Sequence, residues 1–173
     1  MTVVGIDDTD SRERGMCTTY AAARLRERVG GRCLLVRLNP AVPYKTRGNA
    51  ALAVVTDADP ETAFDAACAL VDSDAEIADD RTNPGVVVAP ESPGDVPSEV
   101  ADWTDRAMRE LLSPDSARDI CDRHGYRTAG WKTEQGLVGA LAAVGADRAW
   151  KRSRVDTSYE TISYRERDRW GTD

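Results

Sequence analysis

The chain has 173 residues, 41% of them hydrophobic, with 23 basic and 30 acidic side chains and a formal net charge of -7. This length suits one domain or two small ones, and no apolar run approaches the roughly 20 residues that a membrane helix needs. The chain begins without a secretory signal, so we expect a cytoplasmic protein with no membrane partner, and its acidic balance argues against an ordinary nucleic-acid binder.

The first third of the sequence predicts short apolar strands around an Ala-rich helix. The helix begins after Met16 and ends at the pair Gly30-Gly31, since glycine commonly terminates helices. An irregular segment at 39–49, which contains prolines and a glycine, separates the second strand from the third. The three strands are expected at 2–6, 33–38 and 51–55.

Helices with recognisable caps follow in the middle of the chain. Asp59-Pro60 opens one of them, since Asp is a preferred N-cap and Pro is favoured in the first turn. Ser98 and Ser113 are expected to cap two further helices, the second of which ends near His124. The remaining elements are a helix of small side chains at 135–144 and short strands at 75–78, 86–89 and 159–164.

Between about 50 and 130, this order of elements predicts the β-α-β-β-α-β arrangement of ferredoxin-like folds. The expected fold class is therefore α/β, or α+β, with a ferredoxin-like segment within 51–129. No internal repeat and no low-complexity segment interrupts the pattern.

Charge is distributed unevenly along the chain. The net charge is +4 over 1–56, -14 over 57–122 and +3 over 123–173. Of the 23 basic residues 20 are Arg, and of the 30 acidic residues 20 are Asp. An Asp-rich, Lys-poor composition predicts a salt-adapted organism, in which carboxylates hydrate the protein surface, although a high-GC genome gives the same Arg bias.

Acidic and hydroxyl side chains follow the first strand: Asp7, Asp8 and Asp10, with Thr9 and Ser11 among them. Carboxylates this close in sequence repel one another, and Mg²⁺ with a substrate phosphate would relieve the repulsion. The alternative interpretation is a solvated Asp-rich turn whose side chains cap the backbone.

A second candidate site lies at the start of the first helix, in Gly15-Met16-Cys17-Thr18-Thr19. Free amide groups and the helix dipole favour a phosphate there. Thr18 lies within a turn of the carboxylates, where it is placed to contact a phosphate or to receive one. Simple capping of the helix by Thr18 or Thr19 explains the pattern equally well.

A third candidate site lies in the proline-stiffened segment, where Lys45 and Arg47 flank Thr46 before Gly48. Cations held near a metal–phosphate site neutralise the charge that develops in phosphoryl transfer. An ordinary surface loop is the alternative. Lysine is rare in this chain, which has only three.

The cysteines, the histidine and a basic stretch give no strong indication of a functional site. Four cysteines and one histidine, with no CxxC pair, support neither a zinc site nor a redox pair, so we expect reduced, mostly buried thiols. His124 is favoured near a helix C-terminus by the dipole, without a catalytic role. The basic stretch 148–154, which contains Trp150, is interpreted as a charged surface element, with RNA contact as the alternative.

Several motifs together make the sequence similar to a known family. GIDDTDSRERGMCTTY at 5–20 and RLNPAVPYKTRGNAA at 37–51 closely resemble the archaeal tRNA agmatidine synthetase family. RTNPGVVV at 81–88, GLVGALAAVGA at 136–146 and the terminal TISYRERDRWGT resemble it as well. These motifs occur in the family's order over nearly the whole chain.

The resemblance implies an ATP- and Mg²⁺-dependent enzyme of tRNA modification. The family phosphorylates the C2 carbonyl of the wobble cytidine of an isoleucine tRNA and attaches agmatine there, so ATP, agmatine and that tRNA are the implied partners. Its N-terminal part holds a kinase-like and a ferredoxin-like domain. We therefore expect 1–50 and 130–173 to meet as an ATP-binding kinase-like α/β unit, beside a ferredoxin-like unit at 51–129.

The resemblance also implies functional residues. Asp7, Asp8 and Asp10 would be the metal ligands, and Thr18 would be the family's autophosphorylated threonine. The implied catalytic residues are Asp7, Asp8, Asp10, Thr18, Lys45 and Arg47. Nucleotide contacts are expected from Thr9, Ser11, Gly15, Cys17, Thr18, Thr19, Lys45, Arg47, Gly136 and Gly139.

Two departures from the family pattern matter. The family continues into an oligonucleotide-binding fold and a zinc ribbon that grip the tRNA, whereas this sequence stops at Asp173, so we expect a fragment or short relative that binds tRNA weakly or not at all. Glu134 stands where the family tends to have basic and glycine residues, which would weaken a phosphate contact. The alternative functions are a stand-alone nucleotide-binding or regulatory module and a small-molecule kinase of the same fold.

Overall fold

The computed structural model describes residues 1–46, 48–153, 163–166 and 169–172, with side chains described as far as residue 149. Five helices and seven strands occur within these residues. In chain order they are β1 (Thr2–Asp7), α1 (Thr18–Val29), β2 (Arg32–Arg37), β3 (Ala50–Thr56), α2 (Pro60–Asp74), β4 (Gly85–Ala89), α3 (Ser98–Ala107), α4 (Pro114–His124), β5 (Arg127–Gly130), α5 (Gly136–Ser153), β6 (Ser163–Glu166) and β7 (Arg169–Thr172).

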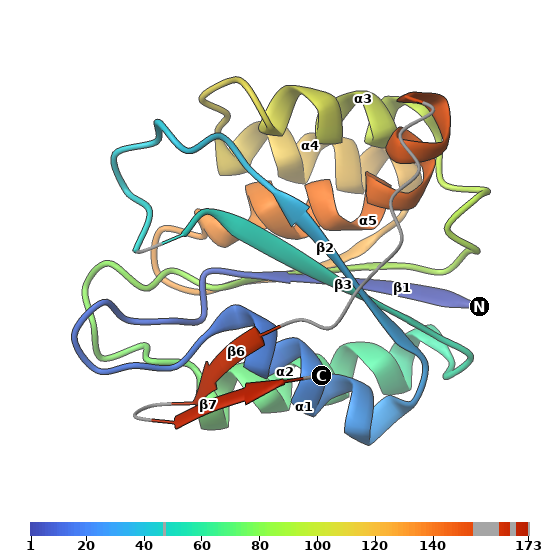
Figure 1. Ribbon diagram of the computed structural model, residues 1–173. Helices are drawn as coiled ribbons and strands as arrows, with labels where there is room; N and C mark the ends of the chain where they lie inside the picture. Colours follow the sequence, from blue (N-terminus) through green and yellow to red (C-terminus); the bar gives the residue numbers. More distant parts are fainter. Residues whose placement is uncertain (47, 154–162, 167–168, 173) are drawn as a thin grey trace.

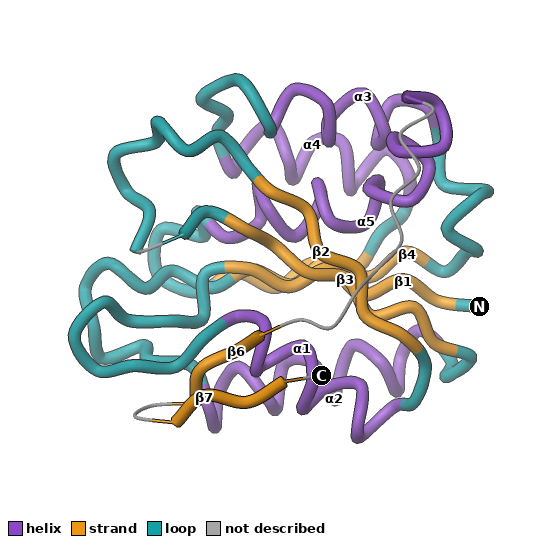
Figure 2. Tube along the Cα trace, viewed as in Figure 1, coloured by secondary structure: helices purple, strands orange, loops and turns teal. Residues whose placement is uncertain are grey.

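The described part of the chain forms three layers around one antiparallel sheet (Figure 1). The sheet has five strands in the order β2-β3-β1-β4-β5. Helices α1 and α2 lie on one face, and α3, α4 and α5 lie on the other, as Figure 2 shows by secondary structure. The β6-β7 hairpin lies beside α1.

The ferredoxin-like order of elements occurs earlier in the chain than the sequence predicts. The mixed α/β class is confirmed, but β1-α1-β2-β3-α2-β4, with the sheet order β2-β3-β1-β4, spans 2–89. Its expected placement within 51–129 depended on a strand at 75–78, which is absent. Ala75 is the C-cap of α2, and the Ile77 N–H donates to the Ala75 carbonyl at 2.9 Å, so turn bonds use the backbone groups that a strand would pair.

Strands from both of the expected units join this sheet, because β1 pairs with β3 on one side and with β4 on the other. The division into 1–50 with 130–173 and 51–129 stays a prediction. The two chain ends do meet within the described residues, since α5 packs directly against β1. A Cβ built on Gly139 of α5 would lie 1.9 Å from the Asp7 Oδ2 atom.

Helix α5 and strand β1 approach each other so closely that their contact requires small residues. A Cβ built on Gly5 would lie 1.9 Å from the carbonyl oxygen of Ala140, so only glycine permits this approach. The neighbours of Gly5 alternate as a strand requires. Val3 packs in the layer of α5, whereas Val4 and Ile6 pack in the layer of α1 and α2.

Two of the three helix caps expected from the sequence are present. Asp59 accepts a hydrogen bond from the Thr62 N–H at 3.0 Å and caps α2, and Ser113 caps α4 by accepting from the Ser116 N–H at 3.2 Å. Ser98 is not a cap. It is the first residue of α3, which no side-chain hydrogen bond caps.

The remaining sequence expectations have mixed outcomes. Of the strand expected at 159–164, residues 159–162 lie outside the described residues, and the last two belong to β6. The expectation of mostly buried thiols is wrong, because only Cys121 is buried and the other three cysteines are half-buried. No helix among the described residues is long and apolar enough to cross a bilayer.

Replacing Gly5 with Ala tests the contact between α5 and β1. The new methyl group would overlap the backbone of Ala140, so the helix and the sheet must separate. We expect the free energy of unfolding to fall by about 3 kcal/mol, which lowers Tm by roughly 10 °C in a domain of this size.

Gly48→Ala is the control for this substitution, because the nearest atom to its Cβ, a guanidinium nitrogen of Arg37, lies 3.8 Å away. Thermal denaturation followed by circular dichroism measures both variants. An unchanged Tm for Gly5→Ala would contradict the close contact.

Candidate active site

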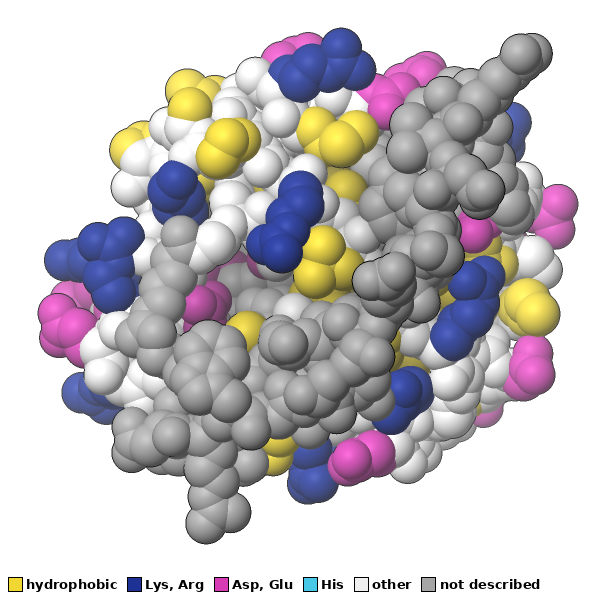
Figure 3. Space-filling model, viewed as in Figure 1, with side chains coloured by type: hydrophobic (Ala, Val, Ile, Leu, Met, Phe, Trp, Pro, Cys, Tyr) yellow, Lys and Arg dark blue, Asp and Glu magenta, His cyan; other side chains and the backbone are white. Residues whose placement is uncertain are grey.

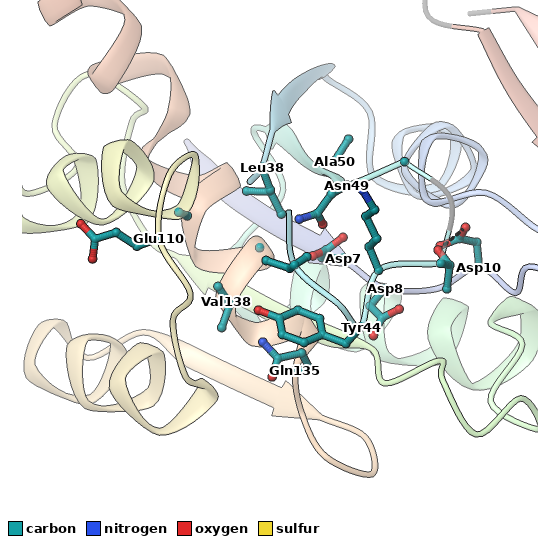
Figure 4. A pocket seen from close by; sticks show the side chains of 16 residues that line it. Asp7, Asp8, Asp10, Leu38, Tyr44, Asn49, Ala50, Glu110, Gln135 and Val138 are labelled. Carbon is teal, nitrogen blue, oxygen red and sulfur yellow. Dashed lines mark hydrogen bonds between the residues drawn. The ribbon is translucent and has the colours of Figure 1, made fainter. Parts of the chain in front are cut away.

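A pocket opens where the end of β1, the segment 38–50 and the start of α5 come together. Figure 4 shows Asp7 and Asp8 near Tyr44 in this pocket, with Asp10 on the far side of Asp8. The described residues that line the pocket are Asp7, Asp8, Asp10, Leu38, Val42, Tyr44, Lys45, Thr46, Gly48, Asn49, Ala50, Ala107, Glu110, Gln135, Val138 and Gly139.

Burial raises the pKa of the two carboxyl groups at the end of β1. The pKa of Asp7 lies well above its ordinary value, first because burial removes water from the carboxylate and then because Asp8 and Asp10 repel its charge. Burial also raises the pKa of Asp8 to about 7, although a hydrogen bond from the Asn83 N–H and the charge of Lys132 oppose the shift. Positive charge placed beside these carboxylates would therefore be strongly stabilised.

Neutral donors from distant segments hold the acidic turn in place. Asp8 adopts a left-handed backbone conformation with φ 58°, and its Oδ2 accepts a hydrogen bond from the Asn83 N–H at 2.9 Å. The Asp10 carboxylate accepts from the Thr46 hydroxyl at 2.8 Å, and the Asp10 carbonyl accepts from the Thr82 hydroxyl at 2.8 Å. These donors fix the position of the turn and add no charge of their own.

The charge of the pocket fits a bound cation. Among the described residues that line it, Lys45 is the one basic side chain, and its ammonium donates to the Pro40 carbonyl. Acidic side chains lie at the edge of a hollow on the face drawn in Figure 3. No group of three or more His, Cys, Asp or Glu side chains in the described part of the chain is arranged to hold a metal by itself. One or two of the lining carboxylates could hold Mg²⁺, with phosphate oxygens completing its coordination.

Thr18, the first residue of α1, is buried beside the acidic turn. Its Oγ1 accepts a hydrogen bond from the Thr9 hydroxyl at 3.1 Å and lies 3.4 Å from the Thr9 amide nitrogen. The loop before it doubles back through left-handed Gly15 and Met16, and the Ser11 N–H donates to the Gly15 carbonyl at 2.8 Å. This reversal brings Thr18 next to Thr9, which lies between Asp8 and Asp10 in the sequence.

The structure brings some of the predicted residues into the pocket and leaves others outside its lining. Asp7, Asp8, Asp10, Lys45 and Gly139 line it. Arg47 lies outside the described residues. The predicted residues that do not line it are Thr9, Ser11, Gly15, Cys17, Thr18, Thr19 and Gly136.

Close packing explains one of these residues without a ligand. Gly136 donates its N–H to the Asn83 carbonyl at 2.9 Å, and a Cβ on Gly136 would lie 2.4 Å from the backbone nitrogen of Gly85. The neighbouring Glu134 carboxylate pairs with the Arg118 guanidinium at 2.7 Å and does not line the pocket. Its negative charge is therefore compensated by α4 and does not face the acidic turn.

Several residues that line the pocket are not among those predicted from the sequence. Tyr44 stands beside the predicted Lys45, and its pKa is raised by burial and by the nearby Asp7. Gln135 precedes the predicted glycine segment, so position in a motif could have suggested both. Glu110 comes from the connection between α3 and α4, and no local sequence signal marks it.

Two family models match separate regions of this chain. The model of the TiaS TCKD domain matches residues 3–58, which carry the acidic turn and the segment after β2, and the model of the TiaS FLD domain matches residues 134–173. The chain belongs to the TiaS family. The two matched regions meet at the pocket, through Asp7 and Gly139.

Curated TiaS relatives match almost all of this chain. The 2-agmatinylcytidine synthetase TiaS of Haloquadratum walsbyi, named for an isoleucine tRNA, is 47% identical over 180 residues, which cover 100% of this chain and 38% of the relative. The protein of the same name from Methanosarcina mazei is 39% identical, over 98% of this chain and 41% of the relative. The chain thus spans about 40% of the length of these TiaS proteins.

Solved TiaS structures have the same fold. The crystal structure of TiaS in complex with an isoleucine tRNA and ATP aligns with a TM-score of 0.74 and 39% identity, over 83% of this chain and 36% of the TiaS chain. The crystal structure of TiaS with the same tRNA, AMPCPP and agmatine aligns with a TM-score of 0.71 and 36% identity, over 83% and 36% of the two chains.

Replacing Asp8 with Asn tests the burial of negative charge in the pocket. The pKa of Asp8, about 7, lies above its ordinary 3.8, so the native state keeps a proton that the unfolded chain releases. Stability then falls as pH rises between those two values. Asn tolerates the left-handed backbone and still accepts from Asn83. We expect Asp8→Asn to gain on the order of 3 kcal/mol at about pH 8 and almost nothing at about pH 4.

Chemical denaturation in EDTA at both pH values measures this effect. Asp65→Asn is the matched control, because Asp65 is exposed on α2. Equal stability of Asp8→Asn and the parent chain at the higher pH would contradict a costly buried charge.

Proposed function

We propose that this chain is the ATP- and Mg²⁺-dependent catalytic part of an agmatidine synthetase. The acidic pocket carries the proposal, because it gathers the carboxylates, Lys45 and Gly139 in a chain of the TiaS family. The relatives are named 2-agmatinylcytidine synthetases of an isoleucine tRNA, and TiaS crystal structures hold that tRNA with ATP, or with AMPCPP and agmatine. ATP, agmatine and the isoleucine tRNA are the proposed ligands here.

The proposed reaction has two steps. The γ-phosphoryl group of ATP moves to the C2 oxygen of the wobble cytidine. This step breaks the bond between the γ-phosphorus and the oxygen of the β-phosphate, releases ADP, and converts the C2 oxygen from a poor leaving group into a good one. The agmatine amine then bonds to C2, phosphate leaves with the former carbonyl oxygen, and the amine loses a proton. The protein's contribution is to position the nucleotide, the unstacked base and the amine, and to stabilise the developing charge.

The residues at the end of β1 would hold the metal in this scheme. One or two of the carboxylates of Asp7, Asp8 and Asp10 would bind Mg²⁺, since burial destabilises the negative charge of Asp7 and Asp8. Bound Mg²⁺ would neutralise charge on the transferred group. Lys45 would exchange its bond to the Pro40 carbonyl for one to a phosphate oxygen. Arg47 is assigned to the same phosphates by its place in the segment.

Thr18 is proposed as a phosphate acceptor of the enzyme itself. Its hydroxyl lies at the N-terminus of α1, where backbone amides and the helix dipole stabilise negative charge. The hydroxyl now accepts from Thr9, so the γ-phosphoryl group reaches it only after that contact opens. Phosphorylation replaces the O–H bond of Thr18 with an O–P bond and releases the proton and ADP.

Calorimetry with ATP tests the metal-dependent site. Because carboxylates outnumber cations in the described lining, we expect the chain to bind ATP at least about tenfold more tightly with Mg²⁺ than in EDTA. Asp7→Asn should remove that difference, while Asp65→Asn, on the exposed face of α2, should preserve it. Equal affinity with and without Mg²⁺ would contradict the proposed site, and tight binding without agmatine-dependent phosphate release would favour a nucleotide-binding module.

Labelling with γ-phosphate-labelled ATP tests the role of Thr18. We expect Thr18→Ala to lose self-phosphorylation almost completely, because the acceptor oxygen is gone. Its circular dichroism spectrum should stay close to that of the parent chain, since the substitution removes the hydrogen bond from the Thr9 hydroxyl, at a cost of about 1 kcal/mol. Thr133→Ala, in the exposed loop before α5, is the control; equal labelling of Thr18→Ala and this control would exclude Thr18 as the acceptor.

A further inference from the structure

The ammonium group of Lys132 lies outside the pocket lining, yet three backbone carbonyls bind it. Its Nζ donates to the carbonyl oxygens of Ile77 at 3.2 Å, Asp79 at 2.5 Å and Thr82 at 2.9 Å. These three residues belong to the connection between α2 and β4, whereas Lys132 belongs to the connection between β5 and α5. One side chain therefore ties together two connections that are distant in sequence.

The connection that Lys132 binds carries the hydrogen bonds of the acidic turn. The Thr82 hydroxyl donates to the Asp10 carbonyl, and the Asn83 N–H donates to the Asp8 carboxylate. On its other side, the Asn83 carbonyl accepts from the Gly136 N–H at the start of α5. Thr82 and Asn83 thus connect the carboxylates with α5 through hydrogen bonds. The ammonium group of Lys132 binds the carbonyl of Thr82 in the same segment.

The chemistry of lysine suits this place better than that of arginine. A tetrahedral ammonium presents three donors from one nitrogen, which match three carbonyls around a point, whereas a guanidinium is a planar fork. This chain uses arginine for 20 of its 23 basic residues, so a lysine here departs from its own composition. Lys132 also has a left-handed backbone with φ 58°, which is unfavourable for a long side chain unless contacts compensate.

We propose that Lys132 is a positioning residue for the acidic pocket. By binding the three carbonyls it holds Thr82 and Asn83 where they fix Asp10 and Asp8. The consequence for Mg-ATP binding rests on the proposed function. The positioning of the Asn83 amide against Asp8 does not, because it is a property of the ligand-free chain.

Hydrogen–deuterium exchange of the 173-residue chain without ligand tests the positioning directly. In Lys132→Met and in Lys132→Arg, we expect amides of 77–84 and 135–137 to exchange about tenfold faster, while the rest of the sheet is unchanged. Thr133→Ala is the control, since Thr133 is exposed and alanine keeps the hydrogen bond from its backbone N–H to Asn83 Oδ1 at 3.4 Å. Unchanged exchange over 77–84 in Lys132→Met, or an equal rise over the whole chain, would overturn the proposal.

Mg-ATP affinity, measured by calorimetry well below Tm, separates positioning from simple stabilisation. We expect Lys132→Met to bind Mg-ATP about tenfold more weakly and Lys132→Arg not to restore the affinity, whereas Thr133→Ala binds like the parent chain. A lower Tm with unchanged affinity would overturn the positioning role. If the parent chain binds no Mg-ATP, the proposed function fails, and the exchange experiment still decides the role of Lys132.

Discussion

The close approach of α5 to β1 is the constraint on which both the core and the pocket depend. Gly5 lets the backbone of α5 lie against the strand, and at the next position along the contact Gly139 leaves room for the Asp7 carboxylate. A third glycine contact, between Gly85 and Gly136, brings the start of the helix against β4. Larger side chains on this line would move the helix outward, and the wall of the pocket would move with it.

This packing places two carboxylates where their negative charge is costly. Desolvation and mutual repulsion raise the pKa of Asp7 and Asp8, while the Asn83 amide and the Thr46 hydroxyl, which are neutral donors, bind Asp8 and Asp10. Hydrogen bonds therefore fix the geometry of the acidic turn while a ligand can still stabilise its charge. A turn that is fixed by hydrogen bonds and whose buried carboxylates are unfavourable when charged is typical of sites that bind a cation together with an anionic substrate.

Local signals made much of this arrangement predictable, and long-range contacts account for the rest. Apolar strands, the Asp59 cap and the acidic turn are encoded in neighbouring residues, so the sequence predicted them. The strand at 75–78 was wrong because turn hydrogen bonds around Ala75 compete with a ladder. Glu110 and the Lys132 contacts were missed because one reaches the pocket from a distant connection and the other binds backbone carbonyls, which every residue has.

The four non-glycine residues with positive φ in the described part of the chain are Asp8, Met16, Lys132 and Glu134. All of them lie in the connections around the acidic turn and the start of α5, and each such conformation costs on the order of 1 kcal/mol or more. Among the described residues, this kind of backbone strain is thus concentrated in one region. That region should open locally before the molecule unfolds, so a ligand bound there would protect these connections from proteases far more than it protects the sheet.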